Sequence, residues 1–202
     1  MTKNESGKLK KWEIALLLAL CFAMLTGAWA QARSEKLSSS LIRLHVLAVS
    51  DDETEQAVKL TVRDSVLAYL SPKLEGAKSA DEAKRIIESE LPGIEAAAKS
   101  VSDGRDVTVT LSRENYPTRT YGKFALPAGT YTSLRVVLGE GRGHNWWCVG
   151  FPPLCLTAAE AEEAMETLPE GDVKLISGRD GSVVLKFHIV ELWGELKNWL
   201  AK

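Results

Sequence analysis

The sequence contains few of the residues that carry most enzyme chemistry. Its 202 residues include only three histidines and three cysteines. None of the histidines lies in a G-x-S-x-G turn or an H-E-x-x-H helix, and no C-x-x-C pair is present. These absences argue against serine hydrolases, zinc proteases of the common type and thioredoxin-like redox proteins.

The chain also lacks a strong charge of either sign. Its formal net charge is -2, which gives no electrostatic reason to expect nucleic acid as a partner. Apolar residues make up 45% of the sequence and charged residues 26%, a balance typical of globular proteins. At this length one domain is the default.

The longest apolar run lies close to the N-terminus. Lysines at positions 3, 8, 10 and 11 precede an apolar run over residues 14–25, and the small-x-small sequence Ala28-Trp29-Ala30 follows it. This order is typical of an export signal that is cleaved before Gln31. We expect residues 1–30 to form a signal peptide, or a membrane anchor if cleavage does not occur. A flexible polar lead-in over 31–40 and a single domain over 41–202 should follow.

The first half of the domain is predicted to contain one strand and two helical regions. The nearly continuous apolar stretch over 41–50 indicates a strand covered on both faces. Helical periodicity follows over 58–70, after a capping-box pattern from Ser50 to Glu53, with Pro72 beyond its end. A second capping box, Ser79 to Glu82, opens a helical region that Pro92-Gly93 should break or kink.

The second half of the domain changes its periodicity. Apolar and polar residues alternate over 107–111 and 134–138, which predicts strands, and a short strand can form over 119–124. Amphipathic helices are predicted after Thr157 and over 189–200. The whole order indicates an α+β fold, with helices packed on a mainly antiparallel sheet.

The segment GRGHNWWCVGFPPLC, residues 141–155, has the most unusual composition. Export would remove Cys21 and leave Cys148 and Cys155 as an even pair in a compartment that permits disulfides. A disulfide between them is the favoured interpretation. Zinc bound by these cysteines and His144 is the alternative, although the six residues between the cysteines do not match a short zinc knuckle.

Two adjacent tryptophans precede Cys148. In an extended strand, Trp146 and Trp147 point to opposite faces, so one should face the core and the other solvent or a neighbouring loop. An exposed tryptophan, a Pro-Pro pair and a short disulfide loop would form a rigid apolar projection of the kind favoured at interface centres. The alternative is that both rings belong to the core and the disulfide only closes a long loop.

Two stretches, IRLHVLAVSDDETEQAVKLTVRD and GHNWWCVGFPPLC, resemble the stage II sporulation protein R family of endospore-forming bacteria. The resemblance extends from residue 42 to about residue 193. It implies a signalling protein without catalytic residues, metal or cofactor. Such a protein is exported from the forespore into the space between two membranes, and only its N-terminal segment contacts a membrane. It triggers a membrane-embedded aspartic protease of the mother cell, which processes the sigma-E precursor.

The resemblance also points to particular residues. The first stretch supplies His45, Asp51 and Arg63, and the second supplies Asn145, Trp146, Trp147, Cys148, Pro152, Pro153 and Cys155. We expect the second stretch to contact the partner or to shape the loop. One competing hypothesis is an exported cell-wall or peptide hydrolase, with His45 or His144 as base and Asp51 or Asp64 as its partner. Another is a structural protein that binds wall polymer through the aromatic loop.

Overall fold

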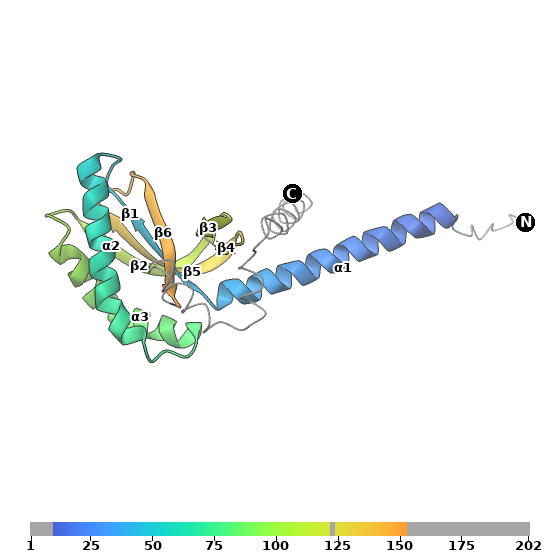
Figure 1. Ribbon diagram of the computed structural model, residues 1–202, viewed down its shortest axis with the longest axis horizontal. Coiled ribbons are helices and arrows are strands. Elements are labelled where there is room, and N and C mark those ends of the chain that lie inside the picture. Colours follow the sequence, from blue (N-terminus) through green and yellow to red (C-terminus); the bar gives the residue numbers. More distant parts are fainter. Residues whose placement is uncertain (1–9, 122–123, 153–202) are drawn as a thin grey trace, which may run out of the picture.

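The computed structural model describes residues 10–121 and 124–152 (Figure 1). These ranges contain three helices: α1 (Lys11–Ser39), α2 (Glu53–Leu74) and α3 (Ala80–Ser100). They also contain six strands: β1 (Ile42–Leu47), β2 (Val107–Tyr116), β3 (Arg119–Tyr121), β4 (Phe124–Leu126), β5 (Gly129–Leu138) and β6 (Asn145–Phe151). The helices predicted after Thr157 and over 189–200 lie outside the described residues.

Four of the strands form the main sheet in the order β2-β5-β1-β6. The β2/β5 and β1/β6 pairs are antiparallel, and β1/β5 is parallel. Strands β3 and β4 form a separate antiparallel pair. The predicted α+β class and the mainly antiparallel sheet are therefore confirmed, with one parallel pair at the centre.

Strand β1 occupies an inner position because nearly every side chain in it can be buried. All six of its residues are buried, and it pairs with β5 on one side and β6 on the other. This confirms the strand that the nearly continuous apolar stretch predicted.

Helices α2 and α3 cover one face of the main sheet (Figure 1). Their apolar faces contribute Val62, Val66 and Ile87 to a core that also contains Leu44 and Val46 of β1. Because alternate residues of a strand share a face, the odd-numbered positions of β1 lie on the other side of the sheet. That opposite face carries Arg43 and His45.

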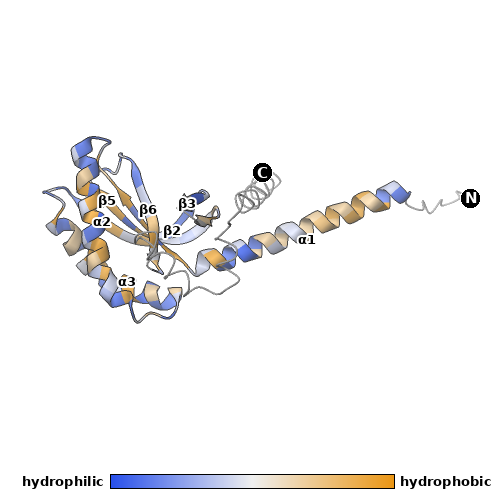
Figure 2. Cartoon of the chain, in the orientation of Figure 1, coloured by the Kyte–Doolittle hydropathy of each residue, from blue (hydrophilic) through white to orange (hydrophobic). Residues whose placement is uncertain are grey.

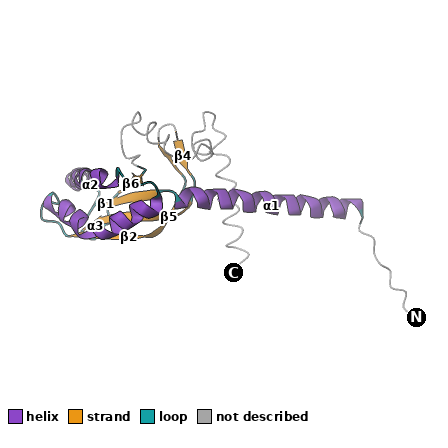
Figure 3. Cartoon of the chain, turned by 90° about the horizontal axis from the view of Figure 1, so that it is seen from below, coloured by secondary structure: helices purple, strands orange, loops and turns teal. Residues whose placement is uncertain are grey.

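Helix α1 corrects one prediction. Residues 31–39 belong to this helix and do not form a flexible lead-in (Figure 3). The stretch contains neither glycine nor proline to stop the helix, and its last turns bury Ser34, Leu37 and Ser38 where α1 packs beside β5. The helix therefore continues until it meets the domain.

The rest of α1 is apolar and projects from the domain (Figure 2). It is long and apolar enough to cross a membrane by length and composition, and it is the one such helix in the described ranges. A signal sequence near an N-terminus has the same properties, so the helix is consistent with a signal or an anchor.

The start of α2 also differs from the prediction. Its N-cap is Asp52, two residues after the predicted cap, and the Ser50 hydroxyl donates a 2.5 Å hydrogen bond to the Asp52 carboxylate. Pro72 lies inside α2, which continues to Leu74. The shift leaves Asp51 in the turn before the helix, where its carboxylate can reach another loop.

The start of α3 agrees with the prediction. Ser79 is its N-cap and accepts a 3.2 Å hydrogen bond from the backbone N–H of Glu82. The helix nevertheless continues through Pro92 and Gly93 without a break. Gly93 fits because α2 passes close to it: a Cβ at this position would lie 1.9 Å from the Tyr69 hydroxyl.

Candidate functional site

The two stretches singled out in the sequence pair as neighbouring strands, β1 and β6. In their antiparallel register His45 lies opposite Trp147, Val46 opposite Trp146, and Leu47 opposite Asn145. His45 Nε2 is 3.0 Å from the Asn145 side-chain oxygen. The fold thus brings His45, Asn145 and both tryptophans to one edge of the described sheet.

The two tryptophans lie on opposite faces of that edge, as predicted. Trp146 shares a face with Val46, the face that the helices cover, and Trp147 shares the other face with His45. Trp146 is exposed at 36%, whereas Trp147 is half-buried. Their surroundings therefore differ.

Trp147 belongs to a set of residues that we call the polar-aromatic cluster: His45, Glu114, Tyr116, Arg119 and Trp147. The Trp147 ring centroid is 5.6 Å from that of His45 and 6.1 Å from that of Tyr116. The Arg119 guanidinium lies 4.0 Å from the Trp147 centroid, within the range of a cation–π contact. Because Arg119 is in β3, this contact ties the β3/β4 hairpin to the main sheet.

Hydrogen bonds fix the polar members of the cluster. Glu114 Oε2 is 3.2 Å from His45 Nδ1 and accepts a 3.2 Å hydrogen bond from the Tyr116 hydroxyl. Burial acts to raise the pKa of Glu114, but hydrogen bonds with Ser133 and His45 outweigh it and hold that pKa below its usual value. Burial is also the main reason why the pKa of Tyr116 is raised. Glu114 is therefore a carboxylate at neutral pH, with Tyr116 protonated beside it.

Trp146 has a different neighbour, Arg63 of α2. The Arg63 guanidinium lies 4.5 Å from the Trp146 ring centroid and also forms a 2.7 Å ion pair with Asp64. The other exposed large apolar side chains in the described ranges all belong to α1. Outside α1, Trp146 is thus a large apolar side chain that the domain presents at its surface.

The loop before Trp146 is attached to α2 and to the turn between β1 and α2. The backbone N–H of His144 donates a 2.5 Å hydrogen bond to the Asp51 carboxylate, and Lys59 Nζ donates a 3.0 Å hydrogen bond to the His144 carbonyl oxygen. The N–H of Gly143 bonds to the Ala48 carbonyl oxygen at 2.9 Å. These bonds fix the position from which β6 begins.

Gly143 is required here for close packing. A Cβ at this position would lie 2.2 Å from the Ser50 carbonyl oxygen, a separation that real side chains do not reach. Lys59 is buried at the same place, and burial lowers its pKa.

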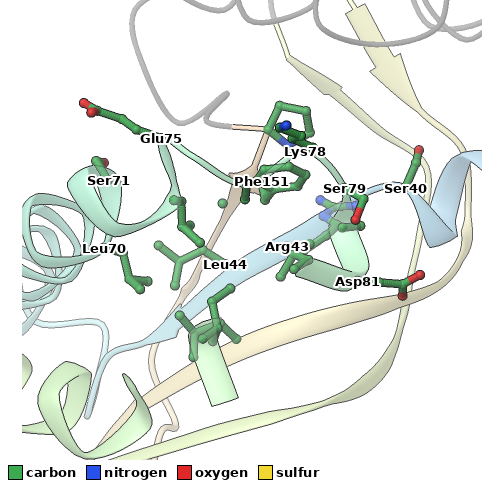
Figure 4. A pocket seen from close by; sticks show the side chains of 18 of the residues that line it. Ser40, Arg43, Leu44, Leu70, Ser71, Glu75, Lys78, Ser79, Asp81 and Phe151 are labelled. Atoms are coloured by element: carbon green, nitrogen blue, oxygen red, sulfur yellow. The ribbon is translucent and has the colours of Figure 1, made fainter. Parts of the chain in front are cut away.

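Pro152 lies at the other end of β6 from Trp146. It is buried and lines a cavity of about 870 Å³ between the end of α1, the turn from α2 to α3 and the end of β6 (Figure 4). Phe151, Leu70 and Leu74 make this cavity largely apolar. Pro152 is therefore part of the packing near α1 and does not share a surface with Trp146.

Two of the predicted residues, Pro153 and Cys155, lie outside the described residues. Cys148 is buried on the helix-covered face, among the core residues of β1 and α2. The Cys148–Cys155 disulfide stays a prediction. Within the described ranges, no group of three or more His, Cys, Asp or Glu side chains is placed to bind a metal.

The pairing of His45 with Asp51 that would favour a hydrolase is not formed. His45 contacts Glu114 and Asn145, whereas another pair that the hydrolase hypothesis named is formed, with the Asp51 carboxylate 2.5 Å from His144 Nδ1. The Asp51 and His144 side chains are 57% and 78% exposed, so water reaches both. Expelling water from a site strengthens the electrostatic interactions inside it, whereas this pair lies on an open surface.

Sequence reasoning missed Glu114, Tyr116 and Arg119 as members of the cluster. It ended the strand at Leu111, but β2 continues to Tyr116. The alternation of Ser112, Glu114 and Tyr116 on one face could have revealed this continuation. Nothing local marks Arg119, because only the folded hairpin places it over Trp147.

The class is an α+β domain with an aromatic edge strand, preceded by an apolar N-terminal helix that is consistent with a signal or an anchor. A family model described as stage II sporulation protein R matches residues 38–161, and the chain belongs to that family. This description refers to sporulation and names no catalytic activity.

The stage II sporulation protein R of Bacillus subtilis (strain 168) is 38% identical to this chain over 129 residues. The matched part covers 62% of this chain and 58% of that relative, so the chain spans less than two thirds of the relative's length. No solved structure matches the chain.

Proposed function

We propose that this chain is an exported sporulation signal. In this proposal the forespore makes the protein and exports it into the space between the two membranes. There it triggers a membrane-embedded aspartic protease of the mother cell, which then processes the sigma-E precursor. The protein acts as an activator and does not catalyse the cleavage itself.

The family match over residues 38–161 carries the proposal. It includes β1, β2, β3 and β6, which hold Trp146 and the polar-aromatic cluster. The apolar α1 supports export, with residues 1–30 as a signal peptide or, without cleavage, as a membrane anchor. Residues 41–202 form a single signalling domain in this proposal.

Activation requires differential binding. A ligand shifts the protease toward its active arrangement only if it binds that arrangement more tightly than the inactive one. A shift from about 1% to about 99% active protease needs a roughly 10⁴-fold difference in affinity. An exposed aromatic side chain on a rigid strand is suited to this, because little conformational freedom is lost when it binds.

The disulfide between Cys148 and Cys155 is part of the proposal. Cys148 is held in the core by β6, so a bond to Cys155 would fix the chain just after Pro152. Mass spectrometry of the exported protein, with and without reduction, tests it. A peptide pair joined by the two cysteines is expected, and alkylation of both thiols without reduction would contradict it.

Reconstitution in a non-sporulating host tests the function. The chain is expressed with its candidate membrane protease and the sigma-factor precursor, and precursor cleavage is followed. Cleavage that needs both the chain and the protease is expected. Cleavage by the protease without the chain would contradict the activator role, and cleavage by the chain without the protease would favour a hydrolase.

A further inference from the structure

The two ends of the main sheet differ in what they carry. Helix α1 enters at the end where β1 begins, and β1 runs away from it toward the turn that starts α2 (Figure 1). Strand β6 begins at this far end and returns toward α1. The end opposite α1, which we call the tip, is therefore built from the turn at Ala48–Asp52 and the loop at Gly139–His144, beside Trp146.

The tip combines an exposed tryptophan with charged neighbours. Trp146 lies beside the Arg63 guanidinium, and the carboxylates of Asp51, Asp52 and Glu53 are exposed in the turn that faces its loop. Glu140 is 70% exposed and pairs with Arg142, which is 77% exposed. Among the side chains exposed at this end of the domain, those of Asp51, Asp52, Glu53 and Glu140 are acidic and that of Arg142 is basic, while His144 lies against Asp51.

The tip is also held rigid. Asp51, Lys59 and Gly143 fix the loop before Trp146 by hydrogen bonds to or from neighbouring backbone groups. A rigid aromatic group with a polar rim is typical of the residues that contribute most to an interface. The surroundings of Trp147, by contrast, are occupied by Arg119 and Tyr116 of the same chain.

We infer that the tip is the surface that binds the protease, and that the partner offers an apolar pocket for the Trp146 indole with lysine or arginine side chains at its rim. The basic rim follows from the acidic side chains of the tip. This inference rests on the proposed function and assigns its contact surface. A retained α1 would hold the domain by the end opposite the tip, so that the tip faces away from the anchoring membrane.

Photocrosslinking in the reconstituted host tests the inference. A photoreactive amino acid replaces Glu140 or Arg142 at the tip, or Lys84 or Glu88 on α3, in the full chain. The α3 positions are matched controls because they are also exposed, at 47% and 50%. Cleavage of the precursor is measured in the same cells.

Crosslinks to the protease from the tip and not from α3 are expected, and the chains with the substituted α3 positions should still trigger cleavage of the precursor. If the precursor is cleaved but the protease is crosslinked from α3, or is not crosslinked from the tip, the inference would be overturned. The proposed function would still stand. No dependence of cleavage on the chain would overturn the proposed function, and the inference with it.

A charge-removal pair tests the basic rim. Asp52→Asn with Glu53→Gln removes two charges from the start of α2 at the tip. Asp81→Asn with Glu82→Gln removes two charges from the start of α3 at the other end of the domain. We expect the tip variant to lower the rate of precursor cleavage about tenfold and the α3 variant to leave it unchanged. Equal rates of precursor cleavage for the two variants would overturn the inference that basic side chains surround the partner's pocket.

Discussion

Trp146 and Trp147 are neighbours in one strand, yet the molecule uses them differently. Trp147 is half-buried in the polar-aromatic cluster, between His45 and the Arg119 guanidinium. Trp146 is on the other face, exposed beside Arg63. Adjacent residues of a strand point to opposite faces. The elements that pack on each face then decide whether an aromatic side chain is covered by its own chain or is available to a partner.

The two faces of β6 should therefore serve stability and signalling separately. Mutations on the Trp147 side should act mainly through stability, because its neighbours belong to the same chain. Mutations on the Trp146 side should act mainly on signalling.

Trp147→Ala should be the most damaging change. It removes an aromatic ring that contacts His45, Tyr116 and Arg119, and we expect a loss of about 3 kcal/mol in the free energy of unfolding. For a chain of this size, that loss lowers the melting temperature by about 8 °C. A thermal melt followed by circular dichroism measures it. A melting temperature equal to that of the unmutated protein would show that the cluster does not stabilise the domain.

Gly143→Ala should have the next largest effect. The added Cβ would meet the Ser50 carbonyl oxygen, so the loop before Trp146 has to move, at a cost of about 2 kcal/mol. Gly76→Ala is the matched control, because no atom lies within 4 Å of the position of its added Cβ. Chemical denaturation of both variants checks the prediction. Equal stability of the two would mean that the loop is not fixed at Gly143.

Glu114 should make stability depend on pH in acid. Its pKa in the folded protein is below the usual 4.5, so its contribution is present above that pH and is lost as the pH falls further. Glu114→Gln should cost about 1 kcal/mol at neutral pH and should flatten the loss of stability below pH 4.5. Denaturation curves over a pH series test this. An unchanged slope in the variant would exclude Glu114 as a source of the acid sensitivity.

Trp146→Ala should have the smallest effect on stability. Its ring is exposed and its main described contact is Arg63, so we expect a loss below about 1 kcal/mol. The same thermal melt used for Trp147→Ala provides the comparison. A loss as large as that of Trp147→Ala would remove the distinction between the two residues.

Much of this arrangement could be predicted from the sequence. The apolar stretch around Val46 indicated a strand covered on both faces, and the adjacency of the tryptophans predicted that they point to opposite faces. Both predictions are confirmed, because strand period and burial are local properties. The sequence also predicted Ser79 as the N-cap of α3, and this prediction is confirmed.

What could not be predicted depends on contacts between distant segments. Arg119 lies over the Trp147 ring only when β3 folds back, and buried Lys59 donates hydrogen bonds to Gln56 and to the carbonyl oxygen of the distant His144. The helical continuation over residues 31–39 likewise depends on Leu37 finding a place in the core. Such tertiary contacts override local preference and leave little local signal.

The central claim is that Trp146 contacts the partner whereas Trp147 holds the domain together. The most direct test measures precursor cleavage and the melting temperature for Trp146→Ala in the reconstituted system. The account predicts that cleavage is lost while the melting temperature stays within about 3 °C of the unmutated protein. Full cleavage by a folded Trp146→Ala protein would contradict it.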